Sequence, residues 1–136
     1  MKFRDDIFIS TTYSKGKNLP EILNECNKNN IFNIELGSTH TFSTNLDKSI
    51  KKFKFKYLTH NFFPPKKNNL VMNIASLSDD IRYESIKHIK YCINYSKKIG
   101  SKLYSFHPGF LTDPIKPGRN GRDYDFNWDN TKKVKY

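Results

Sequence analysis

The stretch SDDIRYESIKHIKYCINYSKKIGSKLYSFHPG, residues 78–109, decides the fold because it predicts a long helix followed by a buried strand. Two aspartates open the helix and two lysines close it, as the helix dipole favours. Gly100 then ends it with a residue that tolerates a left-handed conformation, and the strand covers 102–106. Apolar residues recur at close to helical spacing. We expect them to form the buried face: Ile81, Ile86, Ile89, Cys92, Ile93 and Ile99.

The same alternation of strand and helix runs through the residues before this stretch. Short apolar runs predict three more strands, at residues 7–11, 31–36 and 55–60. A helix between the first two strands begins at Asn18. Asn18 and Glu21, three residues apart, together resemble a capping box. A short basic helix capped by Ser43 or Thr44 precedes the third strand and runs to about residue 53. The order β-α-β-α-β-α-β predicts an α/β fold with four parallel strands, because such crossovers are right-handed.

The composition fits one cytoplasmic domain followed by an irregular tail. The 136 residues suit a single domain, and the 15% aromatic content indicates a folded core rather than disorder. No run approaches the roughly 20 apolar residues of a membrane helix, and the first residues do not resemble a signal peptide. Cys26 and Cys92 are expected to be small core residues in a reducing compartment. We expect the domain to cover residues 1–113 and a basic, aromatic tail to cover 114–136, with Tyr124, Phe126 and Trp128 as anchors.

The net charge of +11 is mostly lysine, 20 of the 24 basic residues. Residues 43–69 hold seven lysines against one acid. That segment is either a contact surface for phosphate or nucleic acid, or a solvated helix face, and the second interpretation is favoured because charge runs are common on exposed faces. Arginine is scarce, which argues against sequence-specific DNA binding.

Polar side chains stand where the predicted parallel strands end, which is the edge at which ligand sites form in such sheets. The first strand ends in Ser10-Thr11-Thr12, the second in Glu35, the third in His60-Asn61, and the fourth in His107. We expect His60 and His107 to bind a metal or contact a substrate, because packing alone explains them poorly. Glu35 either binds a ligand or pairs with a lysine.

Other titratable residues give weaker signals. His40 follows the second strand and is a weaker candidate, and His88 is expected to be solvated on the long helix. The sequence contains no GxGxxG, GxxxxGK[ST], HExxH, CxxC or GxSxG motif, and neither cysteine has a catalytic setting.

The segments IFIST (7–11), NIELG (33–37), LTHNFFPP (58–65) and YSFHPGF (104–110) resemble the xylose isomerase-like TIM-barrel superfamily. The resemblance covers roughly residues 6–113, and FHPG with the histidine of the third strand is its most specific part. This superfamily contains sugar-phosphate isomerases and epimerases, to which the chain is most similar, and also DNA-repair enzymes of the endonuclease IV type.

The resemblance implies part of a (β/α)8 TIM barrel with a divalent metal ion, zinc, manganese or magnesium, at the carboxyl rim once the barrel is completed. His60 and His107 match zinc ligands of the endonuclease IV type, whereas in the isomerases these positions more often face the substrate. The expected substrate contacts are Glu35, His60, Asn61 and His107, with Lys66 and Lys67 attracting a phosphate.

The resemblance ends after the fourth strand, and the acidic ligands of strands five to eight have no counterpart. We therefore expect the N-terminal half of a barrel, completed by a second copy or by a separate C-terminal half. The first expectation for its function is a metal-dependent isomerase or epimerase acting on a sugar or sugar phosphate. The alternatives are a zinc phosphodiesterase acting at abasic sites in DNA, and a non-catalytic truncated barrel that binds a partner chain.

Overall fold

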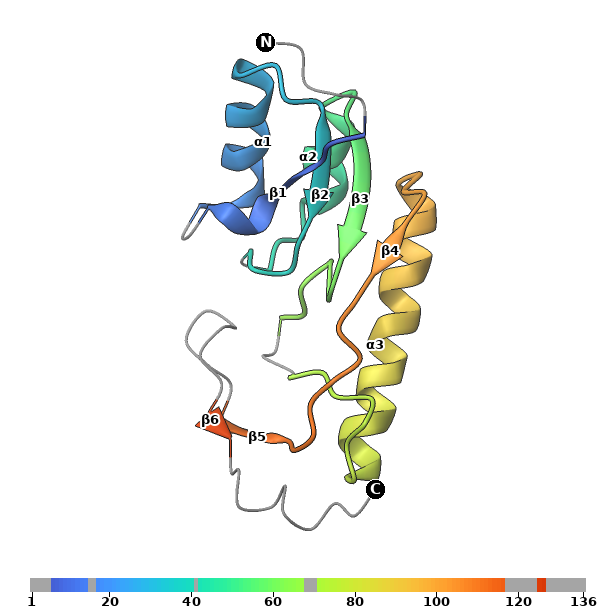
Figure 1. Cartoon of the computed structure of the whole chain (residues 1–136). Helices are drawn as coiled ribbons and strands as arrows, with labels where there is room; N and C mark the ends of the chain where they lie inside the picture. The colour runs from blue at the N-terminus through green and yellow to red at the C-terminus, as the bar shows by residue number, and fades with distance from the viewer. Residues whose placement is uncertain (1–5, 15–16, 41, 68–70, 117–124, 127–136) are drawn as a thin grey trace. The chain divides into compact units, whose positions relative to one another are not determined.

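The computed structural model describes residues 6–14, 17–40, 42–67, 71–116 and 125–126 (Figure 1). Its main sheet has four parallel strands in the order β1-β2-β3-β4. The strands are β1 (Ile9–Ser10), β2 (Asn33–Leu36), β3 (Lys56–His60) and β4 (Tyr104–Ser105). The helices are α1 (Leu19–Lys28), α2 (Leu46–Lys51) and α3 (Asp79–Lys98), with a 3-10 turn η1 (Thr11–Tyr13). The predicted α/β class and the parallel pairing of all four strands are confirmed.

The chain divides into two compact units. The first unit comprises Met1–Pro65 and Cys92–Phe106, and the second comprises Lys66–Tyr91 and His107–Tyr136. The four-stranded sheet, α1, α2 and the last turns of α3 belong to the first unit. Among the described residues, none of the helices combines the length and the apolar character that crossing a bilayer requires.

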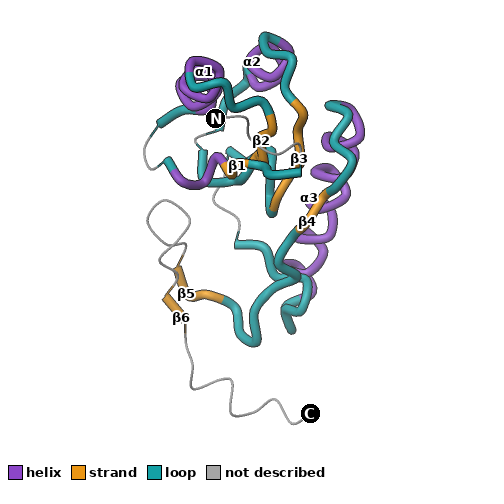
Figure 2. Tube along the Cα trace, turned by 45° about the horizontal axis from the view of Figure 1, so that its top comes forward, coloured by secondary structure: helices purple, strands orange, loops and turns teal. Residues whose placement is uncertain are grey.

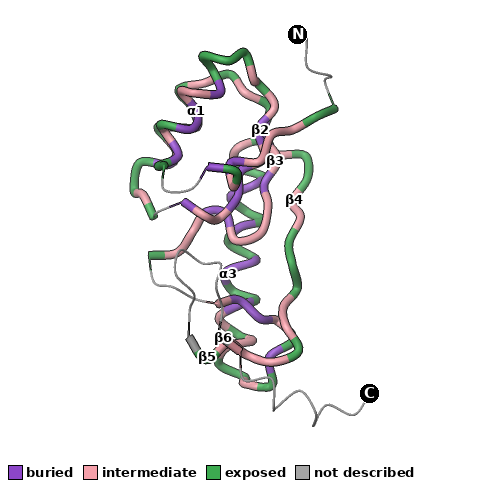
Figure 3. The backbone as a smooth tube through the Cα atoms, turned by 60° about the vertical axis from the view of Figure 1, so that its left-hand side comes forward, coloured by how far each residue is buried: buried purple, intermediate pink, exposed green. Residues whose placement is uncertain are grey.

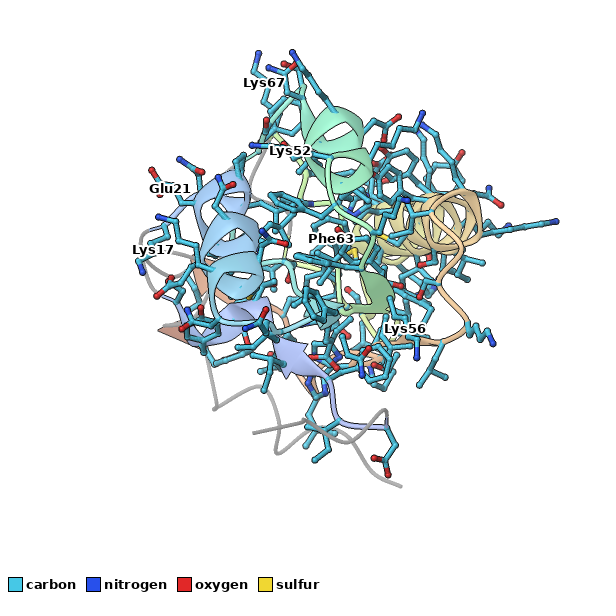
Figure 4. All side chains as sticks on the ribbon, turned by 90° about the horizontal axis from the view of Figure 1, so that it is seen from above. Lys17, Glu21, Lys52, Lys56, Phe63 and Lys67 are labelled. Atoms are coloured by element: carbon cyan, nitrogen blue, oxygen red, sulfur yellow. The ribbon has the colours of Figure 1, made fainter. Side chains whose placement is uncertain are left out.

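The start of α1 follows from the capping box predicted at Asn18. The Asn18 Oδ1 accepts the N–H of Glu21 at 3.0 Å, and the Glu21 carboxylate accepts the N–H of Asn18 at 3.1 Å. Pro20 lies in the first turn, where its missing N–H costs nothing. Two of the free donors at the helix start are thus satisfied within the chain. Figure 4 shows Glu21 and Lys17 on the outer side of this helix.

The second helix is shorter than predicted and begins differently. Its N-terminal cap is Asn45, whose side chain makes no capping bond. The hydroxyl of Ser43 instead accepts the N–H of Asn45 at 3.2 Å, one step before the helix. The first strand is shorter too, because the Ser10 hydroxyl accepts the N–H of Thr12 and starts η1 where the sequence predicted strand.

Among the described residues of the first unit, α1, α2 and the last turns of α3 cover one face of the sheet. Ile34, Leu36 and Tyr57 point to that face and are buried in one apolar cluster with α1, α2 and Tyr95 of α3. Figure 2 shows α1, α2 and the end of α3 along the same side of the strands, and in Figure 3 buried positions repeat along α1. This arrangement follows from the strand order, since right-handed crossovers that always step to the next strand keep every helix on one side.

The buried face of the long helix α3 agrees with the predicted one only in part, since Ile89 and Cys92 are buried as predicted but Ile86 and Ile93 are not. Ile86 and Ile93 are 41% and 47% exposed, and the predicted solvation of His88 is wrong, because this residue is only 4% exposed and its ring stacks on that of Tyr91. Buried polar side chains are tolerated where they find hydrogen-bond partners. The residues buried along the helix are Ser85, His88, Ile89, Cys92, Tyr95 and Ser96.

In the second unit, Asn73 joins two loops. Its side chain is buried, and its Nδ2 donates to the carbonyl of Phe110 at 3.1 Å and to Asp113 at 2.8 Å. Its Oδ1 accepts the N–H groups of Ala75 and Phe110. Both the nitrogen and the oxygen of the Asn73 amide are therefore hydrogen-bonded. These bonds hold the loop that contains Gly109.

Part of the predicted tail is regular. β5 (Pro114–Lys116) pairs antiparallel with β6 (Asp125–Phe126). The ring of Phe126, an expected anchor, contacts that of Phe110 with centroids 5.0 Å apart. The other two expected anchors, Tyr124 and Trp128, lie outside the described residues.

Candidate functional site

The candidate site lies on one face of the parallel sheet, and the register of the strands shows which side chains share that face. The register pairs Glu35 of β2 with Ser10 on one side and Leu58 on the other, and it pairs His60 of β3 with Ser105. Side chains of a strand alternate between its two faces. Because Ile34, Leu36 and Thr59 face the helices, these five residues lie on the opposite face, which we call the inner face: Ser10, Glu35, Leu58, His60 and Ser105.

The inner face is polar at its carboxyl end. Glu35, His60 and Ser105 are each half-buried rather than exposed or sealed in the core. Strands lie about 4.8 Å apart and rise about 3.3 Å per residue, so the Cα atoms of Glu35 and His60 are roughly 8 Å apart. That spacing places a carboxylate and an imidazole on the same face of two neighbouring strands.

Ser105 of β4 holds the His60 side chain, since the Nδ1 of His60 lies 3.0 Å from the Ser105 hydroxyl. Asn61 adopts a left-handed conformation with φ of 58°, donates its N–H to the carbonyl of Ser105 at 2.7 Å, and accepts the Tyr104 hydroxyl at 2.7 Å. Burial raises the pKa of the Tyr104 phenol, so this group stays a donor at neutral pH. β3 and β4 therefore hold His60 and Asn61 together at one edge.

A second histidine is buried at the same carboxyl edge, behind β1 and β2. The Nε2 of His40 lies 2.7 Å from the hydroxyl of Thr11, which also accepts the N–H of Gly37 at 2.9 Å. Among the described residues, Nδ1 of His40 finds no hydrogen-bond partner. Burial lowers the pKa of His40 to about 4. The neutral ring is thus linked through Thr11 to the ends of β1 and β2.

The remaining predicted site residues lie in the second unit. Lys66 pairs with Glu84 at 3.1 Å, so its charge is already met by a carboxylate. Lys67 is exposed, and His107 is exposed just after β4. The structure thus brings Glu35, His60 and Asn61 to one edge of one sheet, whereas the two lysines and His107 belong to the other unit.

The metal expected from the resemblance does not find a complete set of ligands. Among the described residues, no three histidine, cysteine, aspartate or glutamate side chains come together as a metal site requires. His60 and His107, the two candidate ligands, fall in different units. The divalent metal ion therefore stays a prediction. Of the two candidate ligands, His60 belongs to the first unit and His107 to the second.

Sequence reasoning missed the role of Tyr104. The sequence presents it only as an apolar strand residue, yet its hydroxyl holds the main chain of Asn61. Ser105 is the neighbouring polar residue, and its hydroxyl proves to be the partner of His60. Neither contact has a signal in the sequence, because both depend on the register between β3 and β4.

Comparisons with family models, with curated proteins and with solved structures find no match. The chemistry of this edge is therefore inferred from its own residues.

Proposed function

We propose that the inner face binds a sugar or sugar phosphate, and that the chain is part of an isomerase or epimerase of the xylose isomerase-like barrel type. The observation that carries the proposal is the shared face of Glu35 and His60, one strand apart and both at the carboxyl end of a parallel sheet. Active sites of (β/α)8 barrels form at this end.

The helices support the barrel architecture. All of those in the first unit cover one face of the sheet, as in a barrel, where the other face lines the interior. Within the described sheet, β1 and β4 each have a neighbour on one side only. These edges suit further strands, supplied by a second copy or by a complementing C-terminal half.

The residues suit the chemistry of a sugar. Serine hydroxyls at positions 10 and 105 and the Asn61 amide match the donors and acceptors of a polyol. The Glu35 carboxylate is the candidate base that removes a proton from the carbon next to a carbonyl. His60, held by Ser105, is the group that donates to the carbonyl oxygen as negative charge develops there. A proton transferred back to the neighbouring carbon completes an isomerisation, and one returned to the opposite face of the same carbon completes an epimerisation.

The test uses the full chain in D2O with a panel of aldoses, ketoses and their phosphates, with magnesium, manganese or zinc added. Proton NMR detects deuterium entering the carbon next to the carbonyl, which reports proton abstraction even without net turnover. We expect Glu35→Gln to abolish this exchange and His60→Gln to lower it at least ten-fold, in the range of general acid–base contributions. Glu25→Gln, a surface change on α1, is the matched control and leaves the exchange unchanged.

Two outcomes contradict the proposal. One is the absence of both exchange and ligand binding across the panel. The other is nicking of abasic duplex DNA that depends on His60, which assigns the inner face to phosphodiester chemistry instead.

A further inference from the structure

A hollow opens at the amino end of the sheet, away from Glu35 and His60. Its volume is about 240 Å³, and every residue that lines it belongs to the first unit. It lies between α2, the last turn of α3 and the start of β3. The lining residues are Asp47, Ile50, Lys51, Phe53, Phe55, Tyr57, Lys98 and Ile99.

Aromatic rings form one side of the hollow. Phe53 and Phe55 are stacked, with centroids 5.0 Å apart and an angle of 16° between their planes. Tyr57 follows at 6.0 Å from Phe55 and is buried. Phe53 and Phe55 are both half-buried, and the ring of Phe32 also contacts that of Phe55, with centroids 5.9 Å apart. Flat rings of this kind attract other flat rings by stacking.

The lysines come from the same alternating sequence, KKFKFKY at 51–57. Lys51 lines the hollow, and the Nζ of Lys52 lies 5.3 Å from the centre of the Phe53 ring. Lys54 and Lys56 are exposed. Figure 4 shows Lys52 beside α2 and Lys56 at the start of β3. Residues 46–57 hold five lysines against one acid, which favours an anionic partner.

The acid at the hollow is already engaged. Asp47 accepts hydrogen bonds from Lys98 and from the Tyr95 hydroxyl, and the contact with Lys98 lowers the pKa of the carboxyl. Its charge is thus balanced within the chain. Lys51 and Lys52 are both exposed, and the Nζ of Lys52 donates to Asn24 Oδ1 at 3.5 Å.

We propose that this hollow takes one base of a single-stranded nucleic acid, with the phosphates of the strand on the surrounding lysines. The hollow is smaller than the roughly 300–1,000 Å³ of sites that enclose a whole drug-sized ligand, so it suits one ring system and leaves the phosphates outside. The lysines extend beyond the hollow, which favours a strand with several phosphates over a lone nucleotide. Stacked aromatic rings within a basic groove are the usual means of binding single strands without sequence preference. This site is independent of the proposed function.

The test measures fluorescence anisotropy of the full chain with labelled oligo-dT and oligo-rU of about 12 nucleotides, within the usual site sizes of single-strand binders. We expect Phe53→Leu to weaken binding roughly five-fold or more because it removes stacking while keeping apolar packing. Phe53→Tyr keeps the ring and retains the affinity. Thermal unfolding of each variant shows that the fold is intact.

A matched pair of double variants separates a local site from general attraction. Lys51→Gln with Lys52→Gln is expected to reduce the slope of log affinity against log salt by about 1.4, from two phosphate contacts on a single strand. Lys87→Gln with Lys90→Gln removes the same charge from exposed positions of α3 in the second unit and leaves the slope unchanged.

Three results overturn the proposal. Equal losses in the two double variants mean that the attraction is diffuse. Equal affinity for a duplex of the same length means that no base enters the hollow. Affinity for TMP or UMP as high as for the oligonucleotides means that the hollow takes a free nucleotide.

Discussion

At the residue scale, two buried hydroxyls show how a polar pair is tolerated in an apolar core. Thr59 of β3 is 1% exposed and Ser96 of α3 is 4% exposed, and their hydroxyls are hydrogen-bonded to each other. The pair links the sheet to the last turns of α3 within the first unit. Since water does not reach either group, each hydroxyl depends on the other.

We expect Thr59→Val to lower the free energy of unfolding by about 1–3 kcal/mol, because it keeps the side-chain shape but leaves the Ser96 hydroxyl without its hydrogen-bond partner. The double variant Thr59→Val with Ser96→Ala removes both partners and is expected to recover most of that loss. Urea unfolding of the two single variants and the double variant measures the coupling. Additive losses contradict a mutual hydrogen bond.

The second residue-scale prediction concerns His40. Its folded pKa of about 4 lies below the ordinary value of 6.5, so the unfolded chain binds more protons between these values. Stability contributed by the neutral ring is therefore complete above about pH 6.5 and is lost as pH falls toward 4. We expect unfolding at pH 5 to cost about 2 kcal/mol less than at pH 7 from this residue.

Urea unfolding at the two pH values measures the difference, and His40→Asn supplies the control because its contribution to the pH dependence disappears. NMR titration of the ring gives a separate check. A His40 ring that titrates near 6.5 in the folded protein contradicts the assignment.

At the element scale, the loop that contains Gly109 depends on close approach of its main chain to Asn73. Gly109 has φ of 153°, and a Cβ at this position would lie 2.1 Å from Asn73 Oδ1. That oxygen already accepts two N–H groups, so it has little freedom to move. The glycine of the FHPG segment is thus explained by packing in the second unit.

We expect Gly109→Ala to disrupt the Asn73 contacts and to cost more than about 1 kcal/mol, the lower range for a residue forced into a rare conformation. Hydrogen exchange is expected to speed up at the amides of Ala75 and Phe110, which Asn73 Oδ1 holds. Gly100→Ala makes a suitable comparison, because φ there is 74° but no atom lies within 4 Å of the added Cβ. It is expected to leave the exchange of these two amides unchanged.

Elements were more predictable than their contacts. The capping box at Asn18, the parallel strands and the end of α3 near Gly100 all follow from local rules, and the structure confirms them. The buried face of α3 follows from local rules only at Ile89 and Cys92. Ile86 and Ile93 have the apolar character of core residues but are exposed. Ser85 and Ser96 are buried instead, because Asn73 and Thr59 on neighbouring segments bond to their hydroxyls. Spacing gives the period of a helix, whereas its orientation depends on partners distant in sequence.

The site shows the same limit. The sequence predicts polar residues at strand ends, and the register puts Glu35 and His60 on a single face. The sequence does not predict the ion pair between Lys66 and Glu84, because this pair joins a loop to a helix residue eighteen positions away. Nor could it foresee the burial of His40, which depends on Thr11 from another strand end.

At the scale of the whole molecule, the stability of the first unit depends on one apolar cluster. Phe63 is its largest fully buried side chain, and its ring meets that of Tyr95 edge-on with centroids 5.9 Å apart. Figure 4 shows it among the helices of that unit.

We expect Phe63→Ala to cost about 3–5 kcal/mol, because it leaves a cavity that the surrounding helices and strands fill only in part. Phe42→Ala is the matched control, since Phe42 is 47% exposed, and its effect is expected to stay within about 0.5 kcal/mol. Circular dichroism during urea unfolding measures both. Equal losses show that the cluster does not dominate stability.

The order of the strands has a consequence for how the first unit is made. Each strand of the sheet has, as its neighbour in space, the strand that comes next in the sequence. Early pairings therefore need no residues from later in the chain, and closing short loops costs less entropy than closing long ones. During synthesis, β1, α1 and β2 can associate before β3 has emerged from the ribosome, so this sheet can grow in the direction of translation.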